Sequence, residues 1–534
     1  MIRAKKPRSG TQYDLPKEIM QEFCPEIAGP LTKLINQIFE SGEWPSHWKL
    51  EHVVSIPKIP VPESEDDLRP ISLTPFFSKV TEHFIVEWLL EFIGPKIDFR
   101  QYGGLKGNSV AHYIIEFINF VLSSQDSREQ TVVLACYVDF QKAFMRQNHN
   151  KLIEKLSDLD VPGWLLSIVI GFLKERSMIV SYRGSQSSIK SLPGGGRQGT
   201  LLALLLFLVL VNDVGFENQV NNAGEIATSR KKIKAANEIH LKFVNDLILA
   251  EAITFKDGQP INQPQSKLSQ QLSKTQTYAL QNDMKINSRK TKVMVFNPTK
   301  SIEFVPNILL EDNKIEQISE IKLLGIHISN DMKWKSNTLN IVKKASKRLW
   351  VLRRLKNLGA TSSTLLKVYT MQIRSILEFG VPAWQGSLTL GQKTDMERVQ
   401  KCAVHIMLGK NYSSYETALE SLNLENLEDR RVRLCLKFAL KAEAHPKFQN
   451  WFQSLKKHTI LETELNTRKF NQEMTDIKSP HLATSQSYST YTIANQNTNT
   501  THTVLSFLQG ELLLHSCNCS QFSLMLWSLL FISI

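Results

Sequence analysis

The chain has few cysteines for its length, with six among 534 residues. So low a content excludes the disulfide framework that small secreted domains use. Four of the six stand singly in apolar surroundings, as buried thiols do: Cys24, Cys136, Cys402 and Cys435. Cys517 and Cys519 lack the Cys-x-x-Cys spacing and the downstream histidines of a zinc site. We therefore expect a reducing, intracellular compartment, either nuclear or cytoplasmic.

Apolar runs long enough to span a bilayer are also missing. The basic start, residues 1–8, is followed by no apolar stretch, which excludes a secretory signal of the usual kind. Residues 522–534 are apolar but shorter than the roughly 20 residues that span a bilayer. The sequence therefore predicts no membrane partner.

The composition is that of a globular protein, with 42% hydrophobic and 22% charged residues. The formal net charge of +13 suits a polyanionic partner such as nucleic acid. An ordinary basic protein would carry the same charge, so this surplus alone does not choose between the two.

The stretch Leu241–Ala250 has two apolar runs around the polar pair Asn245-Asp246. This pattern predicts a tight β-hairpin with buried arms and a rigid polar tip. Taken alone, such a hairpin is more often structural than functional.

A second carboxylate follows a buried strand. The apolar run Thr131–Val138 predicts a central strand, and it ends at Asp139. A carboxylate there is costly unless a cation or a donor meets it. The glycine-rich basic loop Gln101–Gly107 lacks the ending of a P-loop, so a plain turn is favoured over a phosphate site.

The remaining pattern predicts mostly helix before residue 50, with a stop at Gly42. Residues 256–272 are polar and rich in turn formers, whereas 336–455 are helical and basic with interleaved aromatics, as in a nucleic-acid groove or a solvated bundle. Beyond about residue 470, Ser, Thr, Asn and Gln dominate, which predicts disorder.

Six short blocks occur in a characteristic order: Arg69–Leu73, Asp139–Phe144, Gln198–Thr200 with Asn212-Asp213, Phe243–Asp246, Lys290–Lys292 and Leu323–Gly325. In this order they resemble the reverse transcriptases of non-LTR retrotransposons, close to the jockey-like group. The resemblance extends from about residue 30 to residue 455.

The resemblance implies an α+β, right-hand polymerase fold, with fingers, a palm containing an antiparallel sheet, and a thumb, followed by a helical C-terminal region. We expect N-terminal helices and fingers in 1–125, the palm in 126–335, the thumb and connection in 336–455, and a largely disordered tail in 456–534. The implied function is that of an RNA-directed DNA polymerase, whose partners are an RNA template, a DNA primer and deoxynucleoside triphosphates.

The resemblance also implies residue roles. Asp139 and Asp246 would be metal ligands for two Mg²⁺ ions, and Asn245 occupies the third catalytic position. Among the nucleotide-binding residues, Arg69 would bind the triphosphate, Phe144 would exclude a ribose 2′ hydroxyl, and Gln198 would contact the incoming nucleotide. Lys290 and Lys292 would be the two candidate proton donors to the leaving pyrophosphate. Residues 321–328 would position the primer end.

Several positions depart from the family pattern. The family has an aspartate where this chain has Asn245, and a neutral amide there predicts a large loss of metal affinity and turnover. Further departures lie at Met145, Gly196-Arg197, Ala203–Leu205 and Leu105-Lys106. They favour a polymerase with a partly degenerate, impaired active site; the alternative is a non-catalytic, reverse-transcriptase-like RNA-binding module or a decayed element copy. Because the resemblance starts at the fingers, we also expect no endonuclease part.

Overall fold

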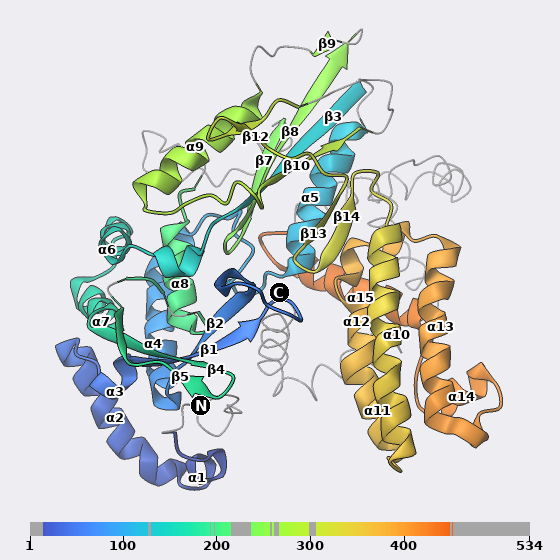
Figure 1. Cartoon of the computed structure of the whole chain (residues 1–534), viewed down its shortest axis with the longest axis horizontal. Coiled ribbons are helices and arrows are strands. Elements are labelled where there is room, and N and C mark those ends of the chain that lie inside the picture. Colours follow the sequence, from blue (N-terminus) through green and yellow to red (C-terminus); the bar gives the residue numbers. More distant parts are fainter. Residues whose placement is uncertain are drawn as a thin grey trace, which may run out of the picture.

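The structure is a computed structural model that describes residues 14–126, 130–192, 194–196, 198–214, 237–256, 259–260, 266–297, 306–448 and 451 (Figure 1). The chain is α+β, with two larger antiparallel or mixed sheets and a helical region after them, as the sequence predicts. The predicted disordered tail, 456–534, lies outside the described residues.

The first sheet joins segments that are distant in the sequence. Its strands are β1 (Leu50–Pro57), β2 (Leu68–Leu73), β4 (Arg176–Tyr182), β5 (Ser185–Gln186) and β6 (Lys190–Leu192). The order is β2-β1-β4-β5, with β6 also paired to β4; β1 and β4 run parallel, and the other pairs are antiparallel. Residues 176–192, which we expected in the palm, therefore share a sheet with residues 50–73.

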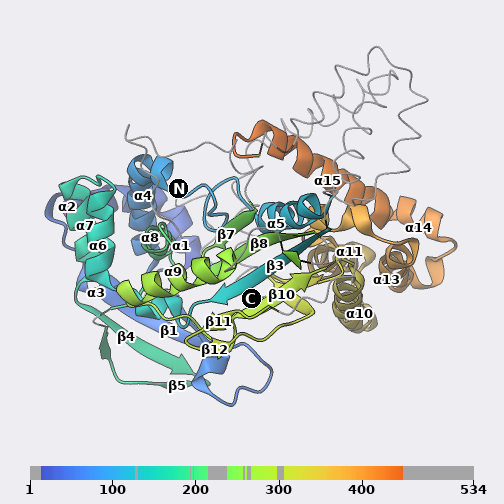
Figure 2. The ribbon, with the colours of Figure 1, turned by 90° about the horizontal axis from the view of Figure 1, so that it is seen from above.

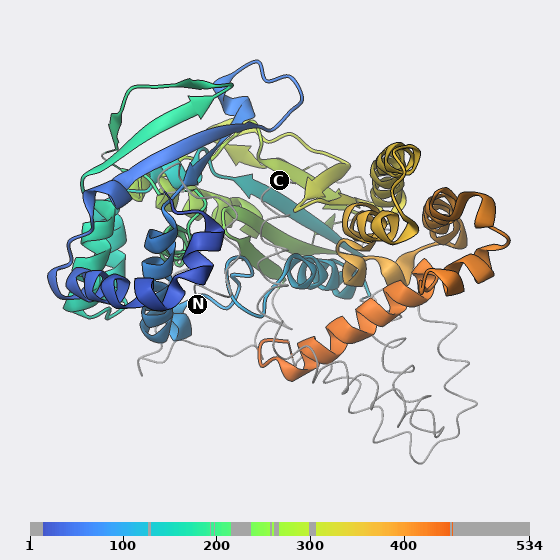
Figure 3. The same cartoon turned by 90° about the horizontal axis from the view of Figure 1, so that it is seen from below.

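Helices pack beside this sheet, and Figure 3 shows them below it. They are α1 (Lys17–Glu22), α2 (Cys24–Ser41), α3 (Ser46–Lys49), α4 (Phe76–Ile93), α6 (His149–Asp158), α7 (Gly163–Leu173) and α8 (Leu201–Leu210). The predicted stop at Gly42 is confirmed, since this residue ends α2 with a φ of 74°. Helix α8 is buried apart from its first residue, because it is apolar on all sides.

The second sheet is antiparallel throughout. Its strands are β3 (Gln130–Asp139), β7 (Glu238–Phe243), β8 (Asp246–Lys256), β9 (Gln259–Pro260) and β10 (Lys292–Phe296), in the order β10-β3-β8-β7 with β9 paired to β8. The predicted central strand is confirmed in β3, of which all residues between the first and the last are buried. Side chains alternate between the two faces: Tyr137 packs in one core cluster, and Cys136 and Val138 pack in another.

Helices cover both faces of this sheet (Figure 2). Helix α5 (Val110–Gln125) packs on the face of Tyr137, while α9 (Lys267–Gln281) packs on the other. Helix α9 begins at residue 267, inside the segment 256–272 that is polar and rich in turn formers. The buried carboxylate of Glu251 accepts hydrogen bonds from the backbone N–H groups of Lys267 and Leu268, and so satisfies the start of α9.

From residue 318 onward the C-terminal region continues the core of the α5 face, whereas Ile308, Leu310 and Ile315 pack in the core of the other face. Its elements are β11 (Leu309–Leu310), β12 (Asn313–Lys314), β13 (Glu320–Leu323), β14 (Ile326–Ser329), α10 (Lys335–Asn357), α11 (Ser362–Tyr369), α12 (Ser375–Glu378), α13 (Leu390–Leu408), α14 (Tyr415–Ser421) and α15 (Leu427–Ala444). Strands β13 and β14 form a second hairpin, within the stretch that the resemblance implies would position the primer end. Helices α10 to α15 lie on the opposite side of the central sheet from the first sheet (Figure 3). Within the described residues, no helix is both long and apolar enough to cross a bilayer.

Candidate active site

The predicted hairpin is confirmed, but its turn lies one residue earlier than expected. Strand β7 ends at Phe243 and β8 begins at Asp246, and these two residues pair across the ladder. The turn is therefore Val244-Asn245. Asp246 belongs to the strand because it pairs with β3 on its other side, and this pairing is not visible in the local sequence.

Asp139 and Asp246 lie directly opposite each other, as register partners at the end of the β3–β8 ladder. Opposite residues of an antiparallel pair point to the same face, with Cβ atoms about 4.5–5.5 Å apart. The structure thus brings together the two carboxylates that the sequence named, from segments more than 100 residues apart in the chain.

The electrostatics of this pair are unfavourable without a cation. Burial, and then the charge of Asp139, raise the pKa of Asp246 to about 7. Burial also raises the pKa of Asp139, although the ammonium group of Lys290, 3.9 Å away, opposes that rise. Two half-buried carboxylates held side by side suit a divalent cation that prefers charged oxygens.

The pair fits one cation better than two. Among the described residues there is no cluster of three or more His, Cys, Asp or Glu side chains that could hold a metal ion. The third position of the expected site is Asn245, whose amide nitrogen lies 3.4 Å from Asp246 Oδ1. An amide supplies one neutral oxygen, so Asn245 adds no negative charge to the pair.

The turn beside the carboxylates is strained. Val244 has a φ of +59°, a left-handed conformation that is rare for a β-branched residue. Such a residue costs on the order of 1–3 kcal/mol and persists only where its surroundings hold it. The loop that starts at Gln101 packs directly on this turn, and a Cβ atom on Gly103 would lie 2.7 Å from the Val244 backbone nitrogen. The glycine-rich loop therefore supports the hairpin, a role that no sequence signal indicated.

A buried ion cluster anchors the hairpin arm β7. Lys242 Nζ lies 2.8 Å from Asp98 Oδ2, and Arg100 Nε lies 2.9 Å from Asp98 Oδ1. Burial acts to raise the pKa of Asp98, but the two cations outweigh it and lower that pKa to about 2. Lys242 also donates to the backbone oxygens of Val211 and Asn212 beyond α8. Sequence reasoning missed this cluster because Lys242 is more than 140 positions from Asp98 and Arg100 in the chain.

Of the two candidate proton donors, only one lies at the carboxylates. Lys290 approaches Asp139 and stays largely exposed. Lys292 lies on β10 and forms an ion pair with Glu316. The structure therefore brings Lys290 to the site and directs the Lys292 ammonium group to another partner.

Phe144 lies close to the pair in the sequence, in the 3₁₀ turn Ala143–Arg146 just after β3. Its ring stacks on Phe207 of α8, with 4.6 Å between the ring centroids. This half-buried ring therefore has a fixed orientation at the edge of the core.

Gln198 and Arg69 belong to the neighbouring first sheet. The backbone oxygen of Gln198 accepts a hydrogen bond of 2.9 Å from the Ser72 N–H, which holds the loop before α8 against β2. Arg69 is half-buried on β2, and burial lowers the pKa of its guanidinium. In the described part of the chain neither side chain is paired with Asp139 or Asp246.

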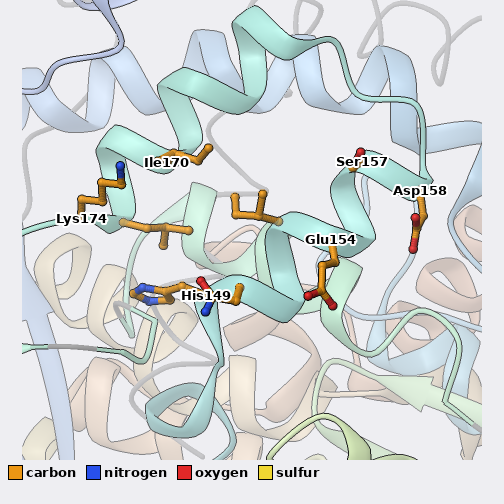
Figure 4. A pocket seen from close by; sticks show the side chains of 9 residues that line it. His149, Glu154, Ser157, Asp158, Ile170 and Lys174 are labelled. Carbon is orange, nitrogen blue, oxygen red and sulfur yellow. The ribbon is translucent and has the colours of Figure 1, made fainter.

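A cavity of about 630 Å³ opens elsewhere, between α6 and α7 (Figure 4). Its lining is mixed, with Lys174 and His149 toward one end and Glu154 and Asp158 toward the other. It contains none of the site residues that the sequence named.

The sequence is similar to known proteins along most of its length. Residues 56–328, from β1 to β14, match the family described as reverse transcriptase (RNA-dependent DNA polymerase). The chain is 24% identical over 421 residues to the probable RNA-directed DNA polymerase from transposon BS of Drosophila melanogaster. It is also 24% identical over 431 residues to the RNA-directed DNA polymerase from mobile element jockey of the same species. Each alignment covers 78% of this chain and 44% of the relative, so the chain spans less than half the length of these curated relatives.

Among solved structures, the chain is similar to apo telomerase from Candida tropicalis, with a TM-score of 0.39, 12% identity and coverage of 78% of this chain and 68% of that one. Telomerase from Candida albicans with a fragment of telomeric RNA gives a TM-score of 0.34, 12% identity and coverage of 76% and 69%. The family match spans the blocks from the fingers to the second hairpin, and the relatives confirm the resemblance to jockey-like elements. The chain belongs to the reverse transcriptase family, and its palm is the antiparallel sheet that holds Asp139 opposite Asp246.

Proposed function

We propose that this chain is a polymerase module that adds deoxynucleotides to a primer 3′ hydroxyl under the direction of an RNA template. The observation that carries the proposal is the pairing of Asp139 with Asp246 at one end of the palm sheet. Burial destabilises both carboxylate anions, and the charge of Asp139 destabilises that of Asp246 further, so a divalent cation would bind there with a favourable change in electrostatic energy.

Mg²⁺ is the cation that this donor set favours, since hard carboxylate oxygens suit it. When bound, such an ion lowers the pKa of an attacking hydroxyl and neutralises charge on a phosphate. Asp139 and Asp246 would hold the ion, and Asn245 would contribute at most one neutral oxygen. We therefore propose that turnover is impaired and that the second ion is bound weakly.

Other side chains are assigned by their positions. Lys290, exposed and near Asp139, would donate a proton to the leaving pyrophosphate. Phe144, fixed by its stack on Phe207, would crowd a ribose 2′ hydroxyl. Arg69 and Gln198, on and beside β2, would contact the triphosphate and the nucleotide from the fingers. We propose that the fingers end near residue 125 and that the palm ends near residue 335, where the thumb begins. Strands β4 to β6 are the exception, because they share a sheet with β1 and β2 and are assigned to the fingers.

Helix α10 supports an RNA or hybrid partner. It exposes several basic residues along its length: Lys343, Lys344, Lys347, Arg348, Arg353 and Arg354. Trp350 lies among them and is 63% exposed. A basic surface with an exposed aromatic ring suits a phosphate backbone and stacked bases. We expect binding to RNA to weaken with salt, and Lys347→Ala to lower the slope of that dependence by about 1.

Primer extension on an RNA template tests the proposal, with Mg²⁺ or Mn²⁺ and with three proteins: the natural chain, Asn245→Asp and Asp246→Asn. We expect Asn245→Asp to extend the primer on the order of 10² times faster than the natural chain, because a charge interaction of about 3 kcal/mol is restored. Asp246→Asn should abolish extension. Salt-sensitive RNA binding without extension by Asn245→Asp would overturn the proposal.

A further inference from the structure

Gln101 occupies the space between the glycine-rich loop and the hairpin tip. Its side chain oxygen accepts hydrogen bonds from the backbone N–H of Val244, at 3.0 Å, and of Gly103, at 2.9 Å. Because both neighbours are donors, only the oxygen of the amide satisfies them. The residue is 2% exposed, so water cannot replace it at this place.

The backbone around Gln101 pairs with β7 in the same region. Lys242 N–H donates to the Arg100 oxygen at 3.0 Å, and Tyr102 N–H donates to the Lys242 oxygen at 2.8 Å. These bonds bring the loop alongside the hairpin arm, and the Gln101 side chain extends the contact to the strained residue Val244. The turn is thus held from outside the hairpin.

The segment that follows α15 fixes the loop from its other side. We call His445–Phe448 together with Trp451 the C-terminal clasp. Lys447 Nζ donates to the backbone oxygen of Gln101 at 2.9 Å and lies 3.6 Å from the ring centroid of Tyr102. The Phe448 ring is fully buried and stacks on Tyr102 at 6.2 Å.

Helix α5 gives the clasp its own anchor. The rings of Phe448 and His112 are nearly parallel, at 8°, with centroids 4.0 Å apart. The Trp451 indole N–H donates to Glu116 Oε2 at 2.7 Å. A continuous path of contacts therefore runs from the end of α15, through Lys447 and Gln101, to the turn beside Asp246.

We propose that Gln101 is a positioning residue for the metal-binding hairpin, and that the C-terminal clasp holds Gln101 in place. Seating of the helical C-terminal region then sets the geometry of Val244-Asn245 and, through it, of Asp246. The catalytic consequence rests on the proposed function, whereas the mechanical coupling does not.

Hydrogen–deuterium exchange on the full chain tests the coupling without any need for activity. We expect Gln101→Met and Lys447→Ala each to increase exchange in the segment 241–249 by about tenfold or more, since local opening becomes easier. Lys441→Ala, at an exposed position near the end of α15, is the matched control and should leave that exchange unchanged. Exchange in the buried segment 131–138 reports whether a variant is folded.

A double variant separates positioning from general damage. Glycine adopts a positive φ without strain, so Val244→Gly removes the need for an external hold. We expect Gln101→Met to weaken Mn²⁺ binding by about fivefold, as measured by electron paramagnetic resonance. The double variant Gln101→Met with Val244→Gly should recover most of the lost affinity.

Unchanged exchange at 241–249 in both Gln101→Met and Lys447→Ala would overturn the clasp. Failure of Val244→Gly to restore Mn²⁺ binding would overturn the positioning role. If Asn245→Asp fails to extend a primer while exchange responds as expected, the proposed function fails and the coupling stands.

Discussion

Two aspartates lie beside the same hairpin, and burial acts to raise the pKa of each, but their charged neighbours differ. Asp98 lies between Lys242 and Arg100, and its pKa is lowered to about 2. Asp246 lies opposite a second carboxylate, and its pKa is raised to about 7. The Lys242–Asp98 pair anchors the same hairpin that carries Asp246. Asp98 is thus neutralised by cations of the chain itself, whereas under the proposed function a bound divalent cation would neutralise Asp246.

Removal of the buried Lys242 ammonium group should have the largest effect on stability. Lys242→Met leaves Asp98 buried without one of its two cations, and we expect a loss of about 3–5 kcal/mol in the free energy of unfolding. Denaturant titration measures it. Lys155→Met, which removes a partly buried lysine from its ion pair with Asp213 at the far end of α8, is the comparison variant and should cost less. Equal losses would show that the Asp98 cluster has no special role.

Addition of a third acidic group sharpens the contrast at the hairpin. Asn245→Asp brings another carboxylate next to two that already repel, so we expect lower thermal stability without metal. Mn²⁺ at one hundred times the dissociation constant of this variant should stabilise it by about 2.7 kcal/mol, and should stabilise the natural chain, which binds the ion more weakly, by less. Melting curves with and without Mn²⁺ measure both effects. An equal response of the two proteins to Mn²⁺ would contradict a metal site at the hairpin.

Acid should distinguish the two aspartates by the sign of their effect on stability. The folded pKa of Asp98, about 2, lies below its unfolded value, so its contribution is complete above about pH 4–5 and is lost as the pH falls toward 2. The folded pKa of Asp246, about 7, lies above its unfolded value, so its cost is absent at low pH and grows as the pH rises from about 4 to 7.

We expect Asp98 to contribute on the order of 2 kcal/mol to the loss of unfolding free energy at acid pH. Asp98→Asn should therefore make the unfolding free energy less dependent on pH in the acid range. Asp246→Asn should instead increase stability near and above pH 7 in the absence of metal. Urea titrations between pH 3 and pH 8 measure both trends. A change of the same sign in both variants would remove the distinction between the two sites.

The exposed lysine should have the smallest effect. Lys290 lies 3.9 Å from Asp139 but is 64% exposed, so water screens the pair. We expect Lys290→Ala to change the free energy of unfolding by less than about 1 kcal/mol. Primer extension by Lys290→Ala in the Asn245→Asp background should nevertheless fall, because the proposed proton donor is lost. A large loss of stability would assign Lys290 a structural role.

Much of the fold could be predicted because local pattern and tertiary structure agree. The central strand ending at Asp139, the stop at Gly42 and the hairpin around Asn245 all have local signals in the sequence. Helix α9 had no such signal at its start, because its first N–H groups are satisfied by Glu251 from another strand. The sequence did not predict that β4 belongs to the first sheet, because the pairing of β1 with β4 joins residues more than 100 positions apart.

The sequence by itself determined which groups are available: two carboxylates at strand ends, an asparagine where the family has an aspartate, and a surplus of basic residues. Tertiary structure alone decided that Asp139 faces Asp246, that Lys292 pairs with Glu316 and that Gln101 holds the turn at Val244. The reason is physical: burial and long-range pairing decide the charge and orientation of a side chain, and these depend on neighbours that the chain brings together only when it folds.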